Sequence, residues 1–148
     1  MAGYDRLTPE GKKFYDELKK LKQQEVFIGY QSGEVTDDRG VDIAMFNELG
    51  TSSSPARPFL RQSVDDNRDK IDQMCEAQAR ELTKGGTAER CLKQLGVFGK
   101  SLVQEKIENG SFEPNAPSTI RKKKSDKPLI DTGKMRQSVN FVIRKKGG

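Results

Sequence analysis

The sequence predicts an α+β fold: a small, mostly antiparallel sheet packed by two long amphipathic helices and an N-terminal helix, with long loops. Apolar residues recur at helical spacing over 8–23, 58–83 and 88–109. Two short segments, 25–30 and 138–143, are rich in β-branched and aromatic residues, which is typical of strands. The length of 148 residues, without an internal repeat, indicates a single domain over 1–148.

The first predicted helix, 8–23, has a clear start and one apolar face. Thr8 can cap it, and Pro9 suits the first position because the N–H that it lacks would have no partner there. Its apolar residues lie at i, i+4 and i+7: Phe14, Leu18 and Leu21. We expect this narrow stripe to lie on the sheet or on a neighbouring subunit.

In the strand 25–30, Val26 and Ile28 share one face with Tyr30, and Phe27 points to the other. The segment 31–40 holds glycines and acids with little to bury, so we expect a mobile loop or hairpin tip. Two strands alone make a marginal sheet. At least one more short strand is therefore expected, from 31–40 or from another subunit.

The segment 41–49 is apolar nearly all round, which predicts a short buried helix at the centre of the core. Gly50 suits the position after its end, where φ is positive.

The stretch 47–61 links this helix to the next one. Arg57 precedes a proline and is pushed towards an extended conformation, whereas Pro58 fits the first turn of a new helix. Pro55 and Pro58 make the connection rigid, which indicates that the angle between the helices matters. We expect Phe59 and Leu60 to anchor this corner to the core. Arg57 or Arg61 is expected to meet an acidic group in the same or the next subunit.

The predicted helices 58–83 and 88–109 form an antiparallel hairpin, because Gly85 and Gly86 separate them and Thr87 can cap the second. In the first of these helices, the polar run 65–70 is expected to be a solvated face. The apolar residues on either side of it recur at helical spacing: Leu60, Val64, Ile71, Met74, Cys75 and Leu82.

The chain after residue 110 has little to bury. Residues 111–127 are expected to form a basic loop or arm, and 117–120 could form one helical turn. Pro128 begins a short apolar anchor, and Asp131 starts a brief helix with Met135 pointing inward.

The strand 138–143 follows, and the last residues, 144–148, are expected to be a flexible basic tail. The strand alternates its apolar side chains, with one face formed by Val139, Phe141 and Ile143, and Val142 on the other.

Composition limits the core and confines the positive charge to one end. Apolar and charged residues make up 32% and 33% of the chain, so we expect a modest core, with disordered segments or further burial in an assembly. Residues 1–116 carry 17 Lys and Arg against 20 Asp and Glu, a net charge of −3. Residues 117–148 carry 10 against 2, a net charge of +8.

The sequence lacks the residues of the commonest catalytic and metal sites. There is no histidine, no Cys-x-x-Cys pair and no glycine-rich phosphate loop. Cys75 and Cys91 are predicted to be reduced thiols of a cytosolic protein. We expect no catalytic residue, metal, cofactor or small-molecule substrate. No apolar run suggests a membrane span or a secretory signal.

Asp131-Thr132-Gly133 resembles the catalytic tripeptide of aspartic proteases. That chemistry needs two carboxylates that share one proton. Here Lys134 and Arg136 follow, and nearby positive charge keeps a carboxylate ionised. A helix N-cap is therefore the favoured interpretation of Asp131.

The cluster Arg121, Lys122, Lys123 and Lys124 admits two interpretations. It is either a solvated, flexible charge run or a contact with DNA phosphates or an acidic partner. No aromatic residue is interleaved with it, so base stacking is not suggested.

Two sequence blocks resemble the tail-completion (neck) proteins of tailed bacteriophages, the minor tail protein Z-like morphogenesis family. The first is Asn-Glu-Leu-Gly-Thr at 47–51 with Pro-Ala-Arg-Pro-Phe-Leu-Arg at 55–61. The second is Pro-Asn-Ala-Pro-Ser-Thr-Ile at 114–120 with Lys-Pro-Leu-Ile-Asp-Thr-Gly-Lys-Met-Arg-Gln-Ser at 127–138. The likeness covers roughly 25–143, and small departures occur at Leu49, Ser54 and Met135.

The resemblance implies a non-enzymatic virion protein, made in the host bacterial cytoplasm, that joins head and tail at the neck. Such proteins act as rings, here expected to be hexameric, around the DNA channel and contact the tail tube and the head connector. The residues expected at subunit or partner interfaces are Pro55, Arg57, Pro58, Phe59, Arg61, Pro128 and Asp131. A non-specific DNA-binding module that uses the basic C-terminal segment is the alternative.

Overall fold

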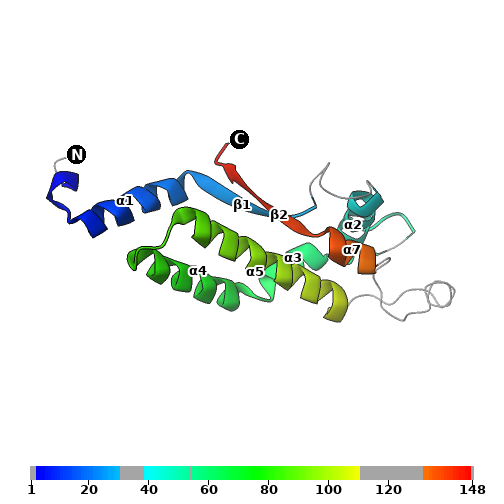
Figure 1. The fold of residues 1–148 in the computed structure, drawn as a ribbon. Helices are drawn as coiled ribbons and strands as arrows, with labels where there is room; N and C mark the ends of the chain where they lie inside the picture. Colours follow the sequence, from blue (N-terminus) through cyan, green and yellow to red (C-terminus); the bar gives the residue numbers. More distant parts are fainter. Residues whose placement is uncertain (1–2, 31–38, 54, 111–131, 148) are drawn as a thin grey trace.

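The structure, a computed structural model, describes residues 3–30, 39–53, 55–110 and 132–147. An α+β fold is confirmed, with a two-stranded antiparallel sheet among helices (Figure 1). The elements follow in the order η1 (Tyr4–Arg6), α1 (Pro9–Lys22), β1 (Gln24–Gly29), α2 (Arg39–Leu49), α3 (Phe59–Asp65), α4 (Arg68–Thr83), α5 (Ala88–Asn109), α7 (Thr132–Ser138) and β2 (Asn140–Lys145).

Helix α5 is the central element. It contacts both strands and also helices α1, α3, α4 and α7. Figure 1 shows α4 antiparallel to α5 beside it, as the glycine turn predicted, with α1 at one end of the molecule. Helices α2, α3 and α7 gather towards the other end. One helix therefore positions most of the chain.

The strands β1 and β2 form an antiparallel pair in which Ile28 lies opposite Phe141. Both of these side chains face α5. Phe27 lies on the other face, half-exposed, with the Arg144 guanidinium 5.6 Å from its ring centroid. The predicted alternation, with Val26 and Ile28 on one face and Phe27 on the other, is confirmed.

Two glycines allow α5 to lie close against this sheet. A Cβ at Gly96 would overlap the ring of Phe141, and one at Gly99 would overlap the end of the Ile28 side chain. Residues three apart lie on the same face of a helix. The sheet therefore packs against helix backbone, closer than larger side chains would allow.

The predicted helix starts are confirmed for α1 and α5. Thr8 and Thr87 each accept a hydrogen bond from the N–H three residues on, at 3.1 and 3.2 Å. Glu17 of α1 is buried and accepts the Ala88 N–H at 3.3 Å, so a carboxylate also faces the positive end of α5. Gly85 has a φ of 95°, as its place in the turn requires.

The predicted single helix over 58–83 is wrong, because the chain turns at Asp66 and Asn67 to form α3 and α4. The Asn67 amide donates to the Ser63 carbonyl at 2.7 Å and satisfies the end of α3. The Asp66 carboxylate lies 2.6 Å from the Lys106 ammonium of α5. The polar run is exposed to solvent, as expected, but it forms a corner held on α5 rather than one face of a continuous helix.

The prediction that the nearly all-apolar α2 forms the centre of the core is also wrong. Ala44 is buried, but Met45, Phe46 and Leu49 are 47%, 49% and 72% exposed. The main core cluster joins one edge of α2 to α3, α5 and the C-terminal elements: Ala44, Phe59, Val103, Ile107, Met135 and Val139. Within the described chain, α2 packs mainly on α3 and α7.

The expected flexible tail at 144–148 is corrected, because its first residues belong to the sheet. Arg144 lies opposite Glu25, and the Lys146 N–H donates to the Gln23 carbonyl at 2.9 Å. An acidic residue opposite Arg144 favours strand pairing despite the basic composition.

The predicted loop at 31–40 lies outside the described residues except for 39 and 40, which belong to α2. The basic loop or arm at 111–127, the anchor at Pro128 and the helix start at Asp131 also lie outside them. In the part of the chain that the structure describes, the sheet has two strands. The expected third strand, from 31–40 or from another subunit, stays a prediction.

We predict that Gly96→Ala lowers the free energy of unfolding by about 1–2 kcal/mol. Overpacking costs about 1–3 kcal/mol, which exceeds the gain of about 0.5–1 kcal/mol from replacing a helical glycine. Urea unfolding measures the effect. Val97→Ala, at a 57% exposed position of the same helix, is the control and should change stability by less than about 0.5 kcal/mol. If Gly96→Ala were as stable as the wild type, the close contact with Phe141 would be refuted.

Candidate functional site

The connection between α2 and α3 returns to α2 before the second helix begins. The Gly50 N–H donates to the Phe46 carbonyl at 2.8 Å, and the φ of Gly50 is 77°, as predicted for a helix end. The Arg57 N–H donates to the Asn47 carbonyl at 2.5 Å. These two bonds close the loop at both of its ends.

Glu48 fixes the start of α3. Its carboxylate oxygens accept the N–H groups of Leu60 at 2.9 Å and Arg61 at 3.1 Å. Pro58 stands at the N-cap and provides no side-chain acceptor, so Glu48 supplies the partner that these groups need. Its negative charge also faces the positive end of the helix dipole. One side chain of α2 thus helps to set the angle between the two helices.

The predicted interface residues of this corner divide into buried and exposed ones. Arg57 and Phe59 are 4% and 0% exposed, so both are buried within the chain, and an interface role for either stays a prediction. Phe59 anchors the corner to the core, as expected. Pro55 and Arg61 are exposed and Pro58 is half-buried, and an interface role for these three stays a prediction.

Met135 joins the two sequence blocks that carry the resemblance. Its side chain is fully buried, as predicted, and its sulfur lies 3.5 Å from the Asn47 amide nitrogen. Its backbone carbonyl accepts the Tyr30 hydroxyl at 2.8 Å. It also shares a core cluster with Phe59. The structure therefore brings together the block at 47–61 and the described part of the second block.

The remaining predicted site residues, Pro128, Asp131 and the cluster Arg121, Lys122, Lys123 and Lys124, lie outside the described residues. In the described ranges, no three or more Cys, Asp or Glu side chains gather in a way that could hold a metal ion. Among the helices of those ranges, none is long and apolar enough to span a bilayer.

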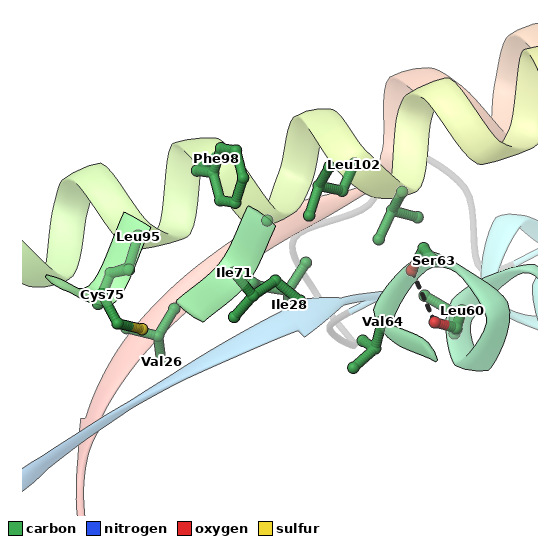
Figure 2. Close-up of a pocket in the computed structure, with 12 residues that line it drawn as sticks. Val26, Ile28, Leu60, Ser63, Val64, Ile71, Cys75, Leu95, Phe98 and Leu102 are labelled. Atoms are coloured by element: carbon green, nitrogen blue, oxygen red, sulfur yellow. Dashed lines mark hydrogen bonds between the residues drawn. The ribbon is translucent and has the colours of Figure 1, made fainter. Parts of the chain in front are cut away.

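An apolar groove of about 370 Å³ lies on α5, between β1 on one side and α3 and α4 on the other (Figure 2). Lining side chains come from all four elements and include Val26, Ile28, Val64, Cys75, Phe98 and Leu102. The Ser63 hydroxyl, also in the lining, donates to the Leu60 carbonyl at 2.6 Å and is thereby satisfied. A groove of this composition suits apolar side chains rather than polar chemistry.

A second apolar hollow of about 260 Å³ lies between α2 and α3, and Leu60 lines both hollows. Met45 and Leu49 line it, and Phe46 is exposed on the same helix. We call Met45, Phe46 and Leu49 the α2 apolar face. Exposed apolar surface that adjoins a groove is typical of interaction sites. The all-round apolar composition of 41–49 is the sequence signal for this surface, although composition alone predicts burial within the chain.

The two cysteines differ in exposure, and both are free thiols. Cys75 is exposed and lines the groove, whereas Cys91 is buried. Burial raises the pKa of both thiols, and the negative charge of Asp72 raises the pKa of Cys75 further. Neither environment favours the reactive thiolate.

Comparisons with protein-family models, with curated proteins and with solved structures found no match. Functional assignment therefore rests on the two sequence blocks and on the geometry of the described residues.

We predict that Glu48→Ala lowers the free energy of unfolding by about 1–2 kcal/mol, because two N–H groups at the start of α3 lose their acceptor. Glu48→Gln, which keeps one oxygen acceptor, should lose less. Glu76→Ala, at an exposed position of α4, is the control. Chemical denaturation measures all three variants, and an equal loss for Glu48→Ala and Glu76→Ala would contradict the capping role.

Tyr30 makes stability depend on alkaline pH. Burial raises its pKa above the ordinary value of 10.0, whereas the unfolded chain ionises near that value. The unfolded state therefore loses its proton first, and stability falls as the pH rises above about 10. Tyr30→Phe should cost about 1 kcal/mol at neutral pH through the lost hydrogen bond. Its unfolding free energy should then decline less steeply than that of the wild type between about pH 9 and pH 11. Parallel declines would contradict this role of Tyr30.

Proposed function

We propose that this chain is a structural virion protein of a tailed phage. It would complete the tail and join it to the head at the neck, as a ring around the DNA channel. The observation that carries the proposal is the junction at Met135, where the two blocks that resemble tail-completion proteins pack together through Asn47 and Phe59. Segments that are distant in sequence but joined in one packed unit support a single shared role.

The apolar surface of the described chain supports assembly with other subunits. In a ring, each subunit presents one patch to its neighbour and a different patch to the subunit on its other side. The chain has two such features, the groove on α5 and the α2 apolar face. Burial between subunits would also compensate for a small core. The proposed ring is hexameric, with the tail tube and the head connector as its partners.

A gene deletion in a phage that encodes this chain tests the proposal. We expect filled heads and separate tails that do not join, and expression of the protein in trans should restore joining. Native mass spectrometry and negative-stain microscopy of the purified protein should detect the ring, or its formation on isolated tails. Normal particles from the deletion strain would overturn the proposal.

Non-specific DNA contact is a second candidate, favoured by the net charge of +8 over 117–148. Three of the residues in this count, Arg144, Lys145 and Lys146, are exposed at one end of the sheet. The affinity of the protein for duplex DNA, measured by titration at increasing salt concentrations, tests this candidate. The variant for comparison has serine in place of all four basic residues at 121–124. Affinity should fall with salt and fall further in the variant. Binding that is unchanged in the variant would contradict this candidate.

We predict that Phe46→Ser with Leu49→Ser impairs assembly without unfolding the chain, because both side chains are largely exposed in the protomer. Stability should change by less than about 1 kcal/mol, while ring formation or head–tail joining should fall at least about tenfold. Val97→Ser, at an exposed apolar position away from the α2 apolar face, is the control. Full joining activity of the double variant would exclude this face from assembly.

A further inference from the structure

The outer edge of β1 has backbone groups that its partner strand does not use. The Lys146 N–H donates to the Gln23 carbonyl, which marks this pair as hydrogen-bonded. In an antiparallel ladder, hydrogen-bonded and non-hydrogen-bonded pairs alternate. By the register of the sheet, the N–H and C=O groups of Gln24, Val26 and Ile28 therefore point away from β2.

The edge of β2 differs from this edge at the matching position. Phe141 lies opposite Ile28, so its N–H also points outward, but the Asn140 side-chain oxygen accepts it at 2.9 Å. Within the described residues, no such side chain satisfies the outward groups of β1. Ile143 and Lys145 of β2 also point outward by this register, so unused backbone groups occur on both edges, and what distinguishes β1 is the groove beside it.

This edge of β1 borders the apolar groove. Val26 and Ile28 line one wall of the groove, whereas no residue of β2 lines it. Figure 2 shows β1 passing along the groove with α5 above it and Val64 of α3 at the end. A strand that paired with β1 would lie over α5, and every second side chain would enter the groove. Hydrogen bonding and apolar burial would occur together.

The charges beside the groove indicate which residues would suit the two ends of a bound segment. Asp72 lies close enough to Cys75, a lining residue, to raise the pKa of its thiol. Asp69 and Glu76 are exposed and, three residues before and four residues after Asp72, lie on the same side of α4 as Asp72. An acidic border of this kind favours basic residues at the ends of a segment in the groove.

We propose that the edge of β1 and the adjacent groove bind an extended polypeptide segment by strand addition. The segment belongs to another protein chain, has apolar residues at alternate positions, and is flanked by Lys or Arg. Backbone hydrogen bonds to Gln24, Val26 and Ile28 supply affinity, and the groove selects segments with apolar side chains at alternate positions. The proposal stands independently of the neck function, because it uses only the edge, the groove and the acidic border.

The test uses the full chain and three synthetic peptides as probes. The first alternates valine and threonine over the six-residue length of β1 and carries lysine at both ends. The second has the same composition with the valines consecutive. The third is the first with N-methyl groups on the residues that would donate to β1. Binding is measured by calorimetry and by residue-resolved amide hydrogen exchange.

The alternating peptide should bind, and both other peptides should bind at least about tenfold more weakly. The amides of Val26 and Ile28 should exchange rapidly in the free protein and become protected, whereas Glu25 and Phe27 should be protected throughout. Val64→Lys in the groove, or Asp72→Lys at its border, should weaken binding. Val97→Lys, which lies outside the groove, should not.

Four results would overturn the proposal. One is protection of Val26 and Ile28 in the free chain, and another is a lack of binding at roughly millimolar peptide, far weaker than a specific strand contact. Equal affinity for the N-methylated peptide is the third. The fourth is perturbation of α3 and α4 without protection of β1, which would indicate that a helix or isolated apolar side chains occupy the groove.

Discussion

The close contact between α5 and the sheet is the constraint on which the other elements depend. A pair of strands is marginally stable in water unless something covers one of its faces. Here Gly96 and Gly99 let Phe141 and Ile28 reach the backbone of α5, so a single helix provides that cover. Once β1 is fixed, Tyr30 at its end meets Met135, and its outer edge lies along the groove.

Local signals predicted local structure well, because caps and turns depend on residues close in sequence. Thr8, Thr87 and Gly50 take the roles that their neighbours predicted. The break between α3 and α4 could not be predicted in this way, because part of its support is the contact of Asp66 with Lys106, forty residues further on. Likewise, the composition of α2 indicated apolar surface but not how little of it the described chain covers.

The candidate site was only partly visible in the sequence. Phe59 was predicted to anchor the corner after α2, and it does, but nothing in the sequence indicated that the charged Arg57 would be buried beside it. The groove could not be predicted, because strand β1 and three helices meet to form it. The meeting of the two sequence blocks at Met135 is likewise a property of the fold, since their order along the chain does not require contact.

The hydrogen bonds that Asn47 and Glu48 make at the start of α3 fix the orientation of that helix, whatever the conformation of the preceding loop. The Asn47 carbonyl and the Glu48 carboxylate hold the returning chain, so the exposed residues at 51–53 and 55–56 do not need a fixed shape to place α3. The entropy cost of closing a loop rises only slowly with its length. This corner can therefore tolerate insertions and sequence divergence. Related chains could alter the outer rim of the molecule there, and with it their choice of neighbour, while the core stays intact.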